Sequence, residues 1–282
     1  MTAMDLNALT RPLPAWHPKA WYYGLARGLL RSVGRLSKGV SIGLAHGFDS
    51  GVMLDHVYAN RAEGRGFLGR LIDRVYLNAP GWAGIRNRGL LLERTVVQCV
   101  EAAADGRQTV RLVDLACGGG QYLLRALARF TPDIAIDATL RDYRPENIDK
   151  ARANAKRLGV EASFDVADAF SDADLAELGM VDIAIVSGLH EIIDDDSRVE
   201  RHFGQIARIL RPDGTLLLTV QPDHPQAEFI ARVLNAHTGK PWAMRLRPVS
   251  LTRRWLGAAG FVVDRVAMEP LGIFGVLQAT KA

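Results

Sequence analysis

The chain has 282 residues, of which 48% are hydrophobic and 23% are charged, a balance typical of a folded globular protein with one large domain, with or without an appendage. This composition excludes an intrinsically disordered chain. The net charge of +4 is uneven, because residues 1–94 carry 13 lysines and arginines against 6 aspartates and glutamates, whereas residues 95–282 carry 22 against 25.

The start of the chain shows neither a targeting signal nor a membrane span. Its first stretch, MTAMDLNALTRPLPAW, lacks a positively charged start followed by an apolar core, so we expect no secretory signal peptide. The sequence contains no run of about 18 apolar residues, so we expect no transmembrane helix. Closely spaced prolines predict a loosely attached arm over residues 1–17. Only two cysteines, Cys99 and Cys117, are present, which favours a reducing, cytoplasmic location.

A helical pattern runs from Ala20 to about Val40. Apolar residues recur there at spacings of three and four, beside a stripe of arginines. The apolar positions are Trp21, Leu25, Leu29, Val33 and Leu36, and the basic ones are Arg27, Arg31 and Arg35. Such a helix fits peripheral contact with the inner face of an anionic membrane through residues 20–40, or binding to an acidic partner. The alternative is a surface helix whose apolar side packs on the domain.

Glycine-punctuated helical segments continue to residue 109, and no alternating strand pattern stands out among them. We therefore predict a basic helical cap over residues 18–109 and a separate domain over residues 110–282.

From residue 110 onwards, short apolar runs alternate with helical stretches. The predicted strands are 110–116, 134–142, 161–168, 181–188 and 215–221, and the predicted helices between them are 122–130, 145–159, 172–179 and 197–214. Pro145 at the start and Gly159 at the end of the second of these helices are typical helix boundaries. This alternation predicts a mostly parallel sheet with helices on both faces, a Rossmann-like α/β fold.

The end of the chain breaks the alternation. FVVDRVAME and IFGVLQATK are two strand-like runs, and only PLG lies between them. A parallel crossover needs about a dozen residues, so these two strands must pair antiparallel. Dinucleotide-binding sheets ordinarily finish with another helix and a parallel strand, so the hairpin argues for a different ligand.

A glycine turn follows the first predicted strand in VRLVDLACGGGQYLL, residues 110–124. It lacks the lysine of a phosphate-binding G-x-x-x-x-G-K-[ST] loop. A dinucleotide fingerprint G-x-G-x-x-G would need a glycine where Leu123 stands, although Gly118 and Gly120 supply its first pair. The residues around the turn must therefore decide the ligand.

The stretch VDLACGGG resembles the first motif of class I S-adenosylmethionine-dependent methyltransferases, D-x-G-x-G-x-G. Asp114, Gly118 and Gly120 match this motif, and Ala116 replaces its first glycine. The resemblance implies a sheet with an antiparallel terminal hairpin, as the end of the chain predicts independently. It also implies S-adenosylmethionine as the cofactor.

Such a cofactor needs acceptors for its ammonium and ribose hydroxyls rather than a cationic cradle. Asp142, about 20 residues beyond the glycines, would accept both ribose hydroxyls. Asp168 would receive the adenine amino group beside the backbone of Ala169, Ser187 would form the floor near the sulfonium, and Arg86 would clamp the carboxylate. The predicted cofactor-binding residues are Asp114, Ala116, Gly118, Gly120, Asp142, Asp168, Ala169, Ser187 and Arg86.

The upstream stretch SGVMLDHVYANRAEGRGFLGRLIDRVYLNAPGWAGIRNR resembles a bacterial family assigned as methyltransferases. Members of that family are sometimes fused to α/β-hydrolase or CDP-alcohol phosphatidyltransferase-like domains. The resemblance covers roughly residues 48–280, and the fusions imply lipid chemistry by association.

His190 and Glu191 follow the fourth predicted strand directly, and we predict that they act in catalysis, with His190 as the general base. The alternative for His190 is a structural role at the strand end. A metal site is not predicted, because H-E-x-x-H would need a histidine in place of Asp194. The acids at 194–196 fit the start of the next helix, where its dipole favours them; the alternative for them is a divalent-cation site.

We therefore predict methyl transfer from S-adenosylmethionine to a small-molecule or lipid-like acceptor. A second hypothesis is a nucleic-acid methyltransferase, since the cap is basic, although no N-P-P-[YF] tetrapeptide follows the fourth strand. A third is a non-catalytic module that binds S-adenosylmethionine at a membrane.

Overall fold

The structure is a computed structural model that describes residues 9–105, 108–130 and 134–282. Of the arm predicted over residues 1–17, residues 1–8 thus lie outside the described part. The chain forms two compact units. Unit 1 contains the residues up to Asn87 together with Asp223–Leu246, and unit 2 contains Arg88–Pro222 and Arg247–Ala282. These limits differ from the predicted boundary between residues 109 and 110.

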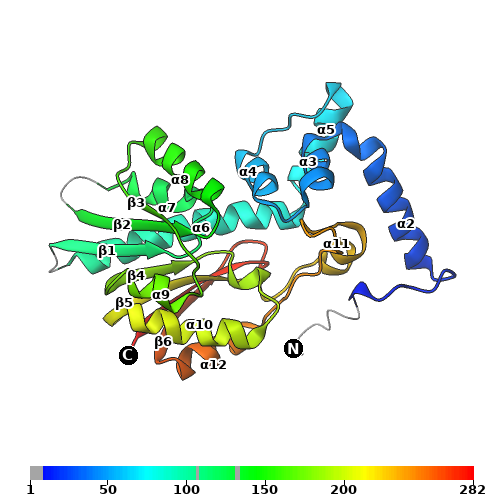
Figure 1. Cartoon of the computed structure of the whole chain (residues 1–282). Helices are drawn as coiled ribbons and strands as arrows, with labels where there is room; N and C mark the ends of the chain where they lie inside the picture. Colours follow the sequence, from blue (N-terminus) through cyan, green and yellow to red (C-terminus); the bar gives the residue numbers. More distant parts are fainter. Residues whose placement is uncertain (1–8, 106–107, 131–133) are drawn as a thin grey trace. The chain divides into compact units, whose positions relative to one another are not determined.

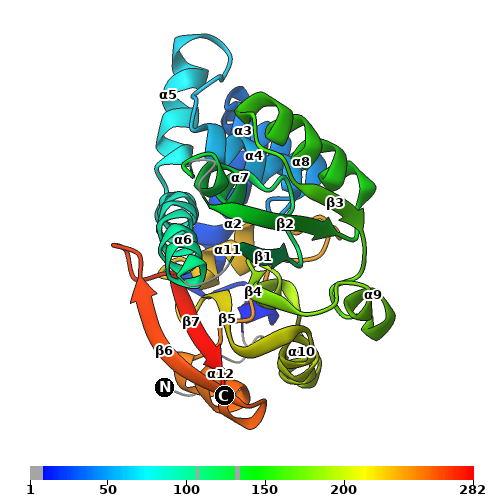
Figure 2. The same cartoon turned by 90° about the vertical axis from the view of Figure 1, so that its left-hand side faces the viewer.

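Unit 2 is built on a seven-stranded sheet with the order β3-β2-β1-β4-β5-β7-β6 (Figures 1 and 2). β1 to β5 are parallel to one another, whereas β7 runs antiparallel to both β5 and β6. The strands are β1 (Thr109–Asp114), β2 (Ala135–Asp142), β3 (Ser163–Val166), β4 (Val181–Val186), β5 (Leu210–Val220), β6 (Phe261–Met268) and β7 (Gly275–Lys281). The predicted Rossmann-like sheet and its antiparallel hairpin are confirmed.

Helices cover both faces of this sheet, as Figure 2 shows. On one face, α6 (Pro80–Ala104), α7 (Gln121–Leu127) and α8 (Pro145–Leu158) bury apolar side chains against β1 and β2. On the other face, α9 (Asp172–Ala176), α10 (Asp196–Ile209) and α12 (Val249–Ala258) do the same against β4, β5 and β7. The all-buried pattern of β4 reflects this double cover.

The described part of unit 1 is mostly helical. Its elements are α2 (Pro18–Arg31), the 3₁₀ helix η1 (Val33–Leu36), α3 (Lys38–His46), α4 (Gly51–Ala59), α5 (Gly66–Leu77), residues 80–87 of α6, and α11 (Ala227–Val233). Tyr23 and Phe48 pack with Ile230, Leu234 and other apolar side chains of 227–246 in one core. Unit 1 is therefore closed by a segment far away in the sequence.

The helix predicted from Ala20 to about Val40 is in fact three elements. α2 ends at Arg31, η1 follows, and α3 begins after Ser37, whose hydroxyl caps it by accepting a hydrogen bond from the amide of Val40 at 3.1 Å. A serine cap starts a new helix because it satisfies an amide that has no partner inside that helix.

The structure differs from the sequence prediction at two further places, the helix end before Pro212 and the segment 221–260. The helix predicted over 197–214 ends at Ile209, and β5 begins at Leu210, because Pro212 cannot continue a helix. α11 and α12 were not predicted from the sequence. Among the described residues, no helix combines the length and apolar character that a membrane crossing requires.

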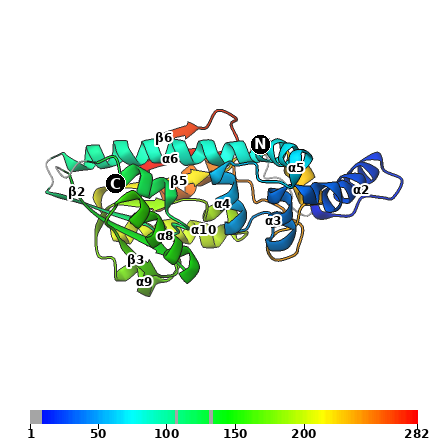
Figure 3. The ribbon, with the colours of Figure 1, turned by 90° about the horizontal axis from the view of Figure 1, so that it is seen from above.

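Figure 3 shows α6 as one unbroken helix. Its apolar residues Leu92, Val96, Cys99 and Val100 join the core of unit 2. A continuous helix explains why the predicted boundary after residue 109 does not separate the two units: their limit falls within α6, between Asn87 and Arg88.

Candidate functional site

The first four strands bring their carboxyl ends to one edge of the sheet. Asp114 at the end of β1 lies opposite Leu140 of β2 and Ile185 of β4. Asp142 at the end of β2 lies opposite Val166 of β3. Ligands of open α/β sheets bind at such an edge, so the predicted residues at these strand ends share one region of unit 2.

The glycine turn between β1 and α7 depends on two left-handed glycines. Gly118 has φ of 54° and Gly120 has φ of 63°, a conformation that favours glycine. A Cβ on Gly120 would lie 2.5 Å from the Leu140 side chain, whereas a Cβ on Gly118 would meet no atom within 4 Å. The backbone at Gly118 therefore borders open space. Ala116 does not take a positive φ, so alanine fits in place of the motif's glycine.

Asp142 ties the glycine turn to the end of β2. Its carboxylate accepts hydrogen bonds from the amide of Gly118 at 2.9 Å, the amide of Arg144 at 2.9 Å and the side-chain amide of Asn147 at 3.0 Å. A carboxylate offers about four acceptor positions, so Asp142 can accept a further donor. The structure thus brings together the turn and the carboxylate that the sequence assigned to one ligand.

Asp114 is fully buried beneath the turn. It accepts a hydrogen bond from the hydroxyl of Tyr122 and one of 3.3 Å from the amide of Ala116. Burial is the largest cause that raises the pKa of Asp114, to about 7, while the Tyr122 hydrogen bond opposes the rise. Sequence analysis did not predict Tyr122, although its place in the first turn of α7 was a usable signal.

The raised pKa of Asp114 predicts a pH dependence of stability. A folded pKa above the unfolded one means that Asp114 contributes stability fully below its unfolded pKa, and that this contribution is lost as the pH rises through about 7. We expect Asp114→Asn to flatten the fall in the free energy of unfolding from pH 4 to 8, measured by urea denaturation. Asp137→Asn, an exposed position on β2, is the control; parallel wild-type and Asp114→Asn curves would contradict the assignment.

Asp168 and Ala169 follow β3, and Ser187 follows β4. Asp168 is exposed, and its carboxylate accepts a hydrogen bond of 2.9 Å from the amide of Phe170. Ala169 is buried and Ser187 is half-buried. Next to Ser187, the amide of Gly188 donates to the hydroxyl of Thr219 at 2.8 Å, which links the end of β4 to β5. The roles of Asp168, Ala169 and Ser187 toward a cofactor stay predictions.

The side chains of His190 and Glu191 lie in different surroundings. The His190 ring is buried against α10, where its Nε2 lies 2.8 Å from Nδ1 of His202 and its ring packs edge-on against Phe203. Burial, together with the charge of Arg247, lowers the pKa of His190 well below its ordinary value. These contacts match the structural role that the sequence left open for His190.

Glu191 belongs to a polar cluster at the ends of β4 and β5. Its Oε1 accepts a hydrogen bond of 2.7 Å from the hydroxyl of Thr219, and Nη1 of Arg88 lies 3.7 Å from the same oxygen. Arg88 also lies over the Phe274 ring, 5.0 Å from its centre. Burial raises the pKa of Glu191, and Arg88 opposes the rise. Neither Arg88 nor Thr219 was predicted, because nothing in their local sequence sets them apart.

The remaining predicted residues lie elsewhere. Arg86 belongs to unit 1, where its guanidinium donates a 2.8 Å hydrogen bond to the carbonyl of Leu77, so its contact with a cofactor stays a prediction. Asp195 is the N-cap of α10, and Asp196 lies 3.0 Å from Arg247. Within the described ranges, no cluster of three or more potential metal ligands occurs.

Comparisons with known proteins agree with this geometry. The uncharacterized protein YnbC of Escherichia coli strain K12 is 37% identical over 263 residues, which are 92% of this chain and 45% of that protein. The chain thus spans less than half the length of this curated relative.

Solved structures share the fold. A possible exported protein from Bordetella parapertussis matches with a TM-score of 0.60 at 20% identity, over 95% of this chain and 99% of that one. Magnesium protoporphyrin IX methyltransferase from Synechocystis, solved with S-adenosylhomocysteine, matches with a TM-score of 0.58 at 16% identity, over 85% of this chain and 98% of that one. An O-methyltransferase family protein from Burkholderia thailandensis matches with a TM-score of 0.52 at 16% identity, over 94% of this chain and 96% of that one.

The sheet order, the glycine turn and the acidic strand ends therefore occur in a fold that S-adenosylmethionine-dependent methyltransferases share. Residues 1–281 match the family described as "Putative methyltransferase". The chain belongs to this methyltransferase family, as the resemblance in its sequence predicted.

Proposed function

We propose that the protein transfers a methyl group from S-adenosylmethionine to a small-molecule or lipid-like acceptor. The observation that carries this proposal is the hydrogen bond between the Gly118 amide and Asp142, because it holds a carboxylate beside a turn that borders open space. Such a pair suits a ligand with hydroxyl donors and no phosphate. One structural neighbour is named as a magnesium protoporphyrin IX methyltransferase, which supports a small-molecule acceptor.

The residues present fit the cofactor in chemical terms. Asp142 would accept the ribose hydroxyls, Asp114 would lie beneath the ammonium end, and Asp168 with the Ala169 backbone would bind the adenine amino group. When bound, S-adenosylmethionine supplies a methyl group on a sulfonium, and S-adenosylhomocysteine is the leaving group. The protein then has to align the acceptor, exclude water and, where needed, take up a proton.

We infer that Glu191, rather than His190, takes up that proton. Glu191 lies at the strand ends with a pKa raised by burial, whereas the His190 ring is enclosed against α10. Asp114, Asp142 and Asp168 are assigned to the cofactor, which leaves Glu191 as the carboxylate for the acceptor side.

Replacing Glu191 by glutamine tests this role. Glutamine keeps an oxygen for the Thr219 hydroxyl but cannot accept a proton, so we expect kcat to fall about 10²–10⁴-fold. The wild-type rate should rise with pH above the ordinary glutamate range, and the variant should lose this rise. His190→Gln is the matched control and should lower stability while leaving the rise in place. If Glu191→Gln keeps the wild-type rate and pH profile, Glu191 takes no part in catalysis.

Calorimetric titration with S-adenosylmethionine, S-adenosylhomocysteine and NAD tests the cofactor, and binding of NAD alone would overturn the proposal. Transfer of a labelled methyl group to an organic-soluble extract or to small-molecule fractions tests the acceptor class. Methylation of bulk RNA, with heparin retention that collapses in salt, would favour the nucleic-acid hypothesis instead. Cofactor binding without transfer to any of these fractions would favour the non-catalytic module.

A further inference from the structure

We propose that unit 1 docks on the surface of an anionic lipid bilayer through the exposed apolar side chains of α2, η1 and α5. We call these side chains the apolar face; they are Trp21, Tyr22, Leu25, Leu29, Val33, Phe67, Leu68, Leu71 and Val75, all of which are exposed. The inference goes beyond the proposed function, because docking of this kind does not depend on which molecule accepts the methyl group.

α2 carries two apolar faces, of which only one packs against other residues that the structure describes. Tyr23, Ala26 and Leu30 belong to the core of unit 1. On the adjoining face, Trp21 and Leu25 are 74% and 65% exposed. The surface helix that the sequence offered as an alternative, with its apolar side on the domain, therefore describes one face of α2 only. Of the predicted apolar stripe, Trp21, Leu25, Leu29 and Val33 are exposed, and Leu36 is half-buried.

α5 repeats this arrangement. Gly69, Asp73 and Leu77 form its buried face, at a spacing of four. Phe67 and Val75 on the other side are 79% and 67% exposed, and Leu68 and Leu71 lie with them at spacings of three and four. This stripe was not predicted from the sequence.

The two segments that carry these stripes are in contact at η1. The amide of Arg65, just before α5, donates a 2.8 Å hydrogen bond to the carbonyl of Leu36 in η1. A Cβ on Gly69 would lie 2.5 Å from the same carbonyl, so the backbones touch. Figure 1 shows the carboxyl end of α2 next to α5. Leu29 and Val33 on one side and Phe67 and Leu68 on the other therefore belong to neighbouring segments.

The charge around this face selects an anionic surface. Exposed arginines flank both stripes: Arg27, Arg31, Arg35, Arg65, Arg70 and Arg74. Over residues 18–36 and 65–77 the single acid is Asp73, which is buried. A second copy of the chain would bring the same positive charge against itself, which opposes self-association. Amphipathic helices with Trp, Phe and Leu on one side and arginines beside them bind anionic lipid at the headgroup boundary.

Flotation of the whole chain with lipid vesicles tests the proposal without any methyl acceptor. We expect binding to vesicles containing phosphatidylglycerol, weaker binding to pure phosphatidylcholine, and loss of the preference at high salt. The double variants Leu25→Gln/Leu29→Gln and Phe67→Gln/Leu71→Gln should each lower the partition coefficient roughly tenfold or more. Val262→Gln, which removes an apolar side chain that is 59% exposed on β6, is the matched control and should bind as the wild type does.

Equal vesicle binding by wild type and both double variants would overturn the proposal, as would absence of binding to phosphatidylglycerol vesicles. Sedimentation velocity tests whether a second copy of the chain, rather than lipid, covers the apolar face. Self-association that the double variants abolish, without vesicle binding, would assign the face to a second copy. Because neither measurement uses S-adenosylmethionine, a failure here leaves the proposed methyl transfer untouched, and a failure of methyl transfer leaves docking testable.

Discussion

Replacing Asp142 by alanine is expected to weaken the binding of S-adenosylmethionine by about 1.5–3 kcal/mol, roughly 10- to 150-fold in Kd. The reason is the loss of charge-assisted hydrogen bonds to the ribose hydroxyls. The structure adds a second cause, since the amide of Gly118 would lose its acceptor and the turn would lose its tie to β2. Isothermal titration calorimetry of the folded variant measures the effect.

Asp137→Ala is the control for this experiment. Asp137 belongs to the same strand, but its carboxylate is half exposed and pairs with Arg111 at 3.3 Å. Exposed pairs of this kind contribute about 0–1 kcal/mol to stability, so cofactor affinity should stay at the wild-type level. An Asp142→Ala protein that binds S-adenosylmethionine as tightly as the control would remove Asp142 from the site.

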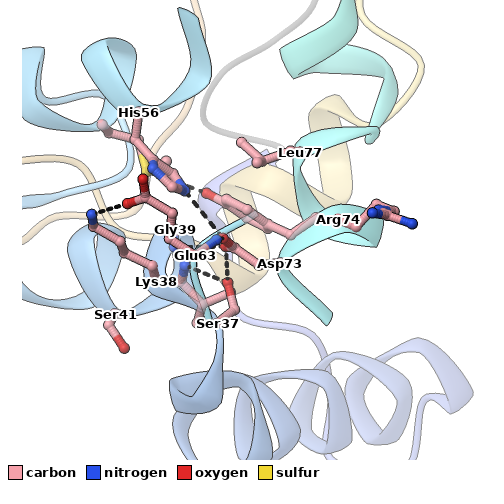
Figure 4. A network of polar contacts seen from close by, with 12 residues as sticks. Ser37, Lys38, Gly39, Ser41, His56, Glu63, Asp73, Arg74 and Leu77 are labelled. Carbon is pink, nitrogen blue, oxygen red and sulfur yellow. Dashed lines mark hydrogen bonds and ion pairs between the residues drawn. The ribbon is translucent and has the colours of Figure 1, made fainter. Parts of the chain in front are cut away.

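Replacing Asp73 by alanine is expected to destabilise unit 1 by about 3 kcal/mol or more, because several buried donors would lose their acceptor. Figure 4 shows this network. The buried carboxylate accepts hydrogen bonds from the hydroxyl of Ser37 at 2.6 Å and from the amides of Gly39 and Glu63 at 2.8 Å each, and Nε2 of His56 lies 3.4 Å away. Asp73 thus joins α3, α4, α5 and the segment before α5.

Urea unfolding and hydrogen exchange at the amides of Gly39 and Glu63 measure this effect, and both amides should lose protection. Glu63→Ala is the control, since its exposed pair with Lys38 contributes little. Asp73→Asn, which keeps the volume, should lose less stability than Asp73→Ala and serves if the alanine variant does not fold. A loss in Asp73→Ala no larger than in Glu63→Ala would contradict the role.

The pH dependence of the same variants gives a second readout. Burial alone would raise the pKa of Asp73, but the hydrogen bonds from Ser37, Gly39 and Glu63 outweigh it and hold the pKa below its ordinary value. A lowered pKa means that the contribution is present above the unfolded pKa of about 4 and is lost as the pH falls through the folded one. Wild type should therefore lose more stability than Asp73→Ala in acid.

The sheet could be predicted from the sequence because short apolar strands alternate with helical segments that are long enough for parallel crossovers. The hairpin of β6 and β7 followed from a connection too short to cross the sheet. The helices of unit 1 were harder. The start of α3 depends on the cap at Ser37, and α11 is held by contacts with Tyr23 and Phe48, far away in the chain.

The candidate site, too, could be predicted from the sequence only in part. Gly118 and Asp142 could be placed together, because parallel strands bring their carboxyl ends to one edge. The direction of a side chain beyond a strand end could not be predicted, and His190 and Glu191, neighbours in sequence, face different surroundings. Arg88 enters the Glu191 cluster from α6, a helix that sequence analysis assigned to the cap.

The composition of unit 1 from two separate stretches has a consequence for biosynthesis. Its helices before Asn87 are synthesised before unit 2, yet the residues that complete their core, among them Ile230 and Leu234, are made only after all of the parallel strands of unit 2. Tyr23 and Phe48 therefore lack these packing partners while the sheet is being synthesised. An expression fragment that stops before residue 223 would keep these side chains exposed permanently, and an aggregating product is the expected result.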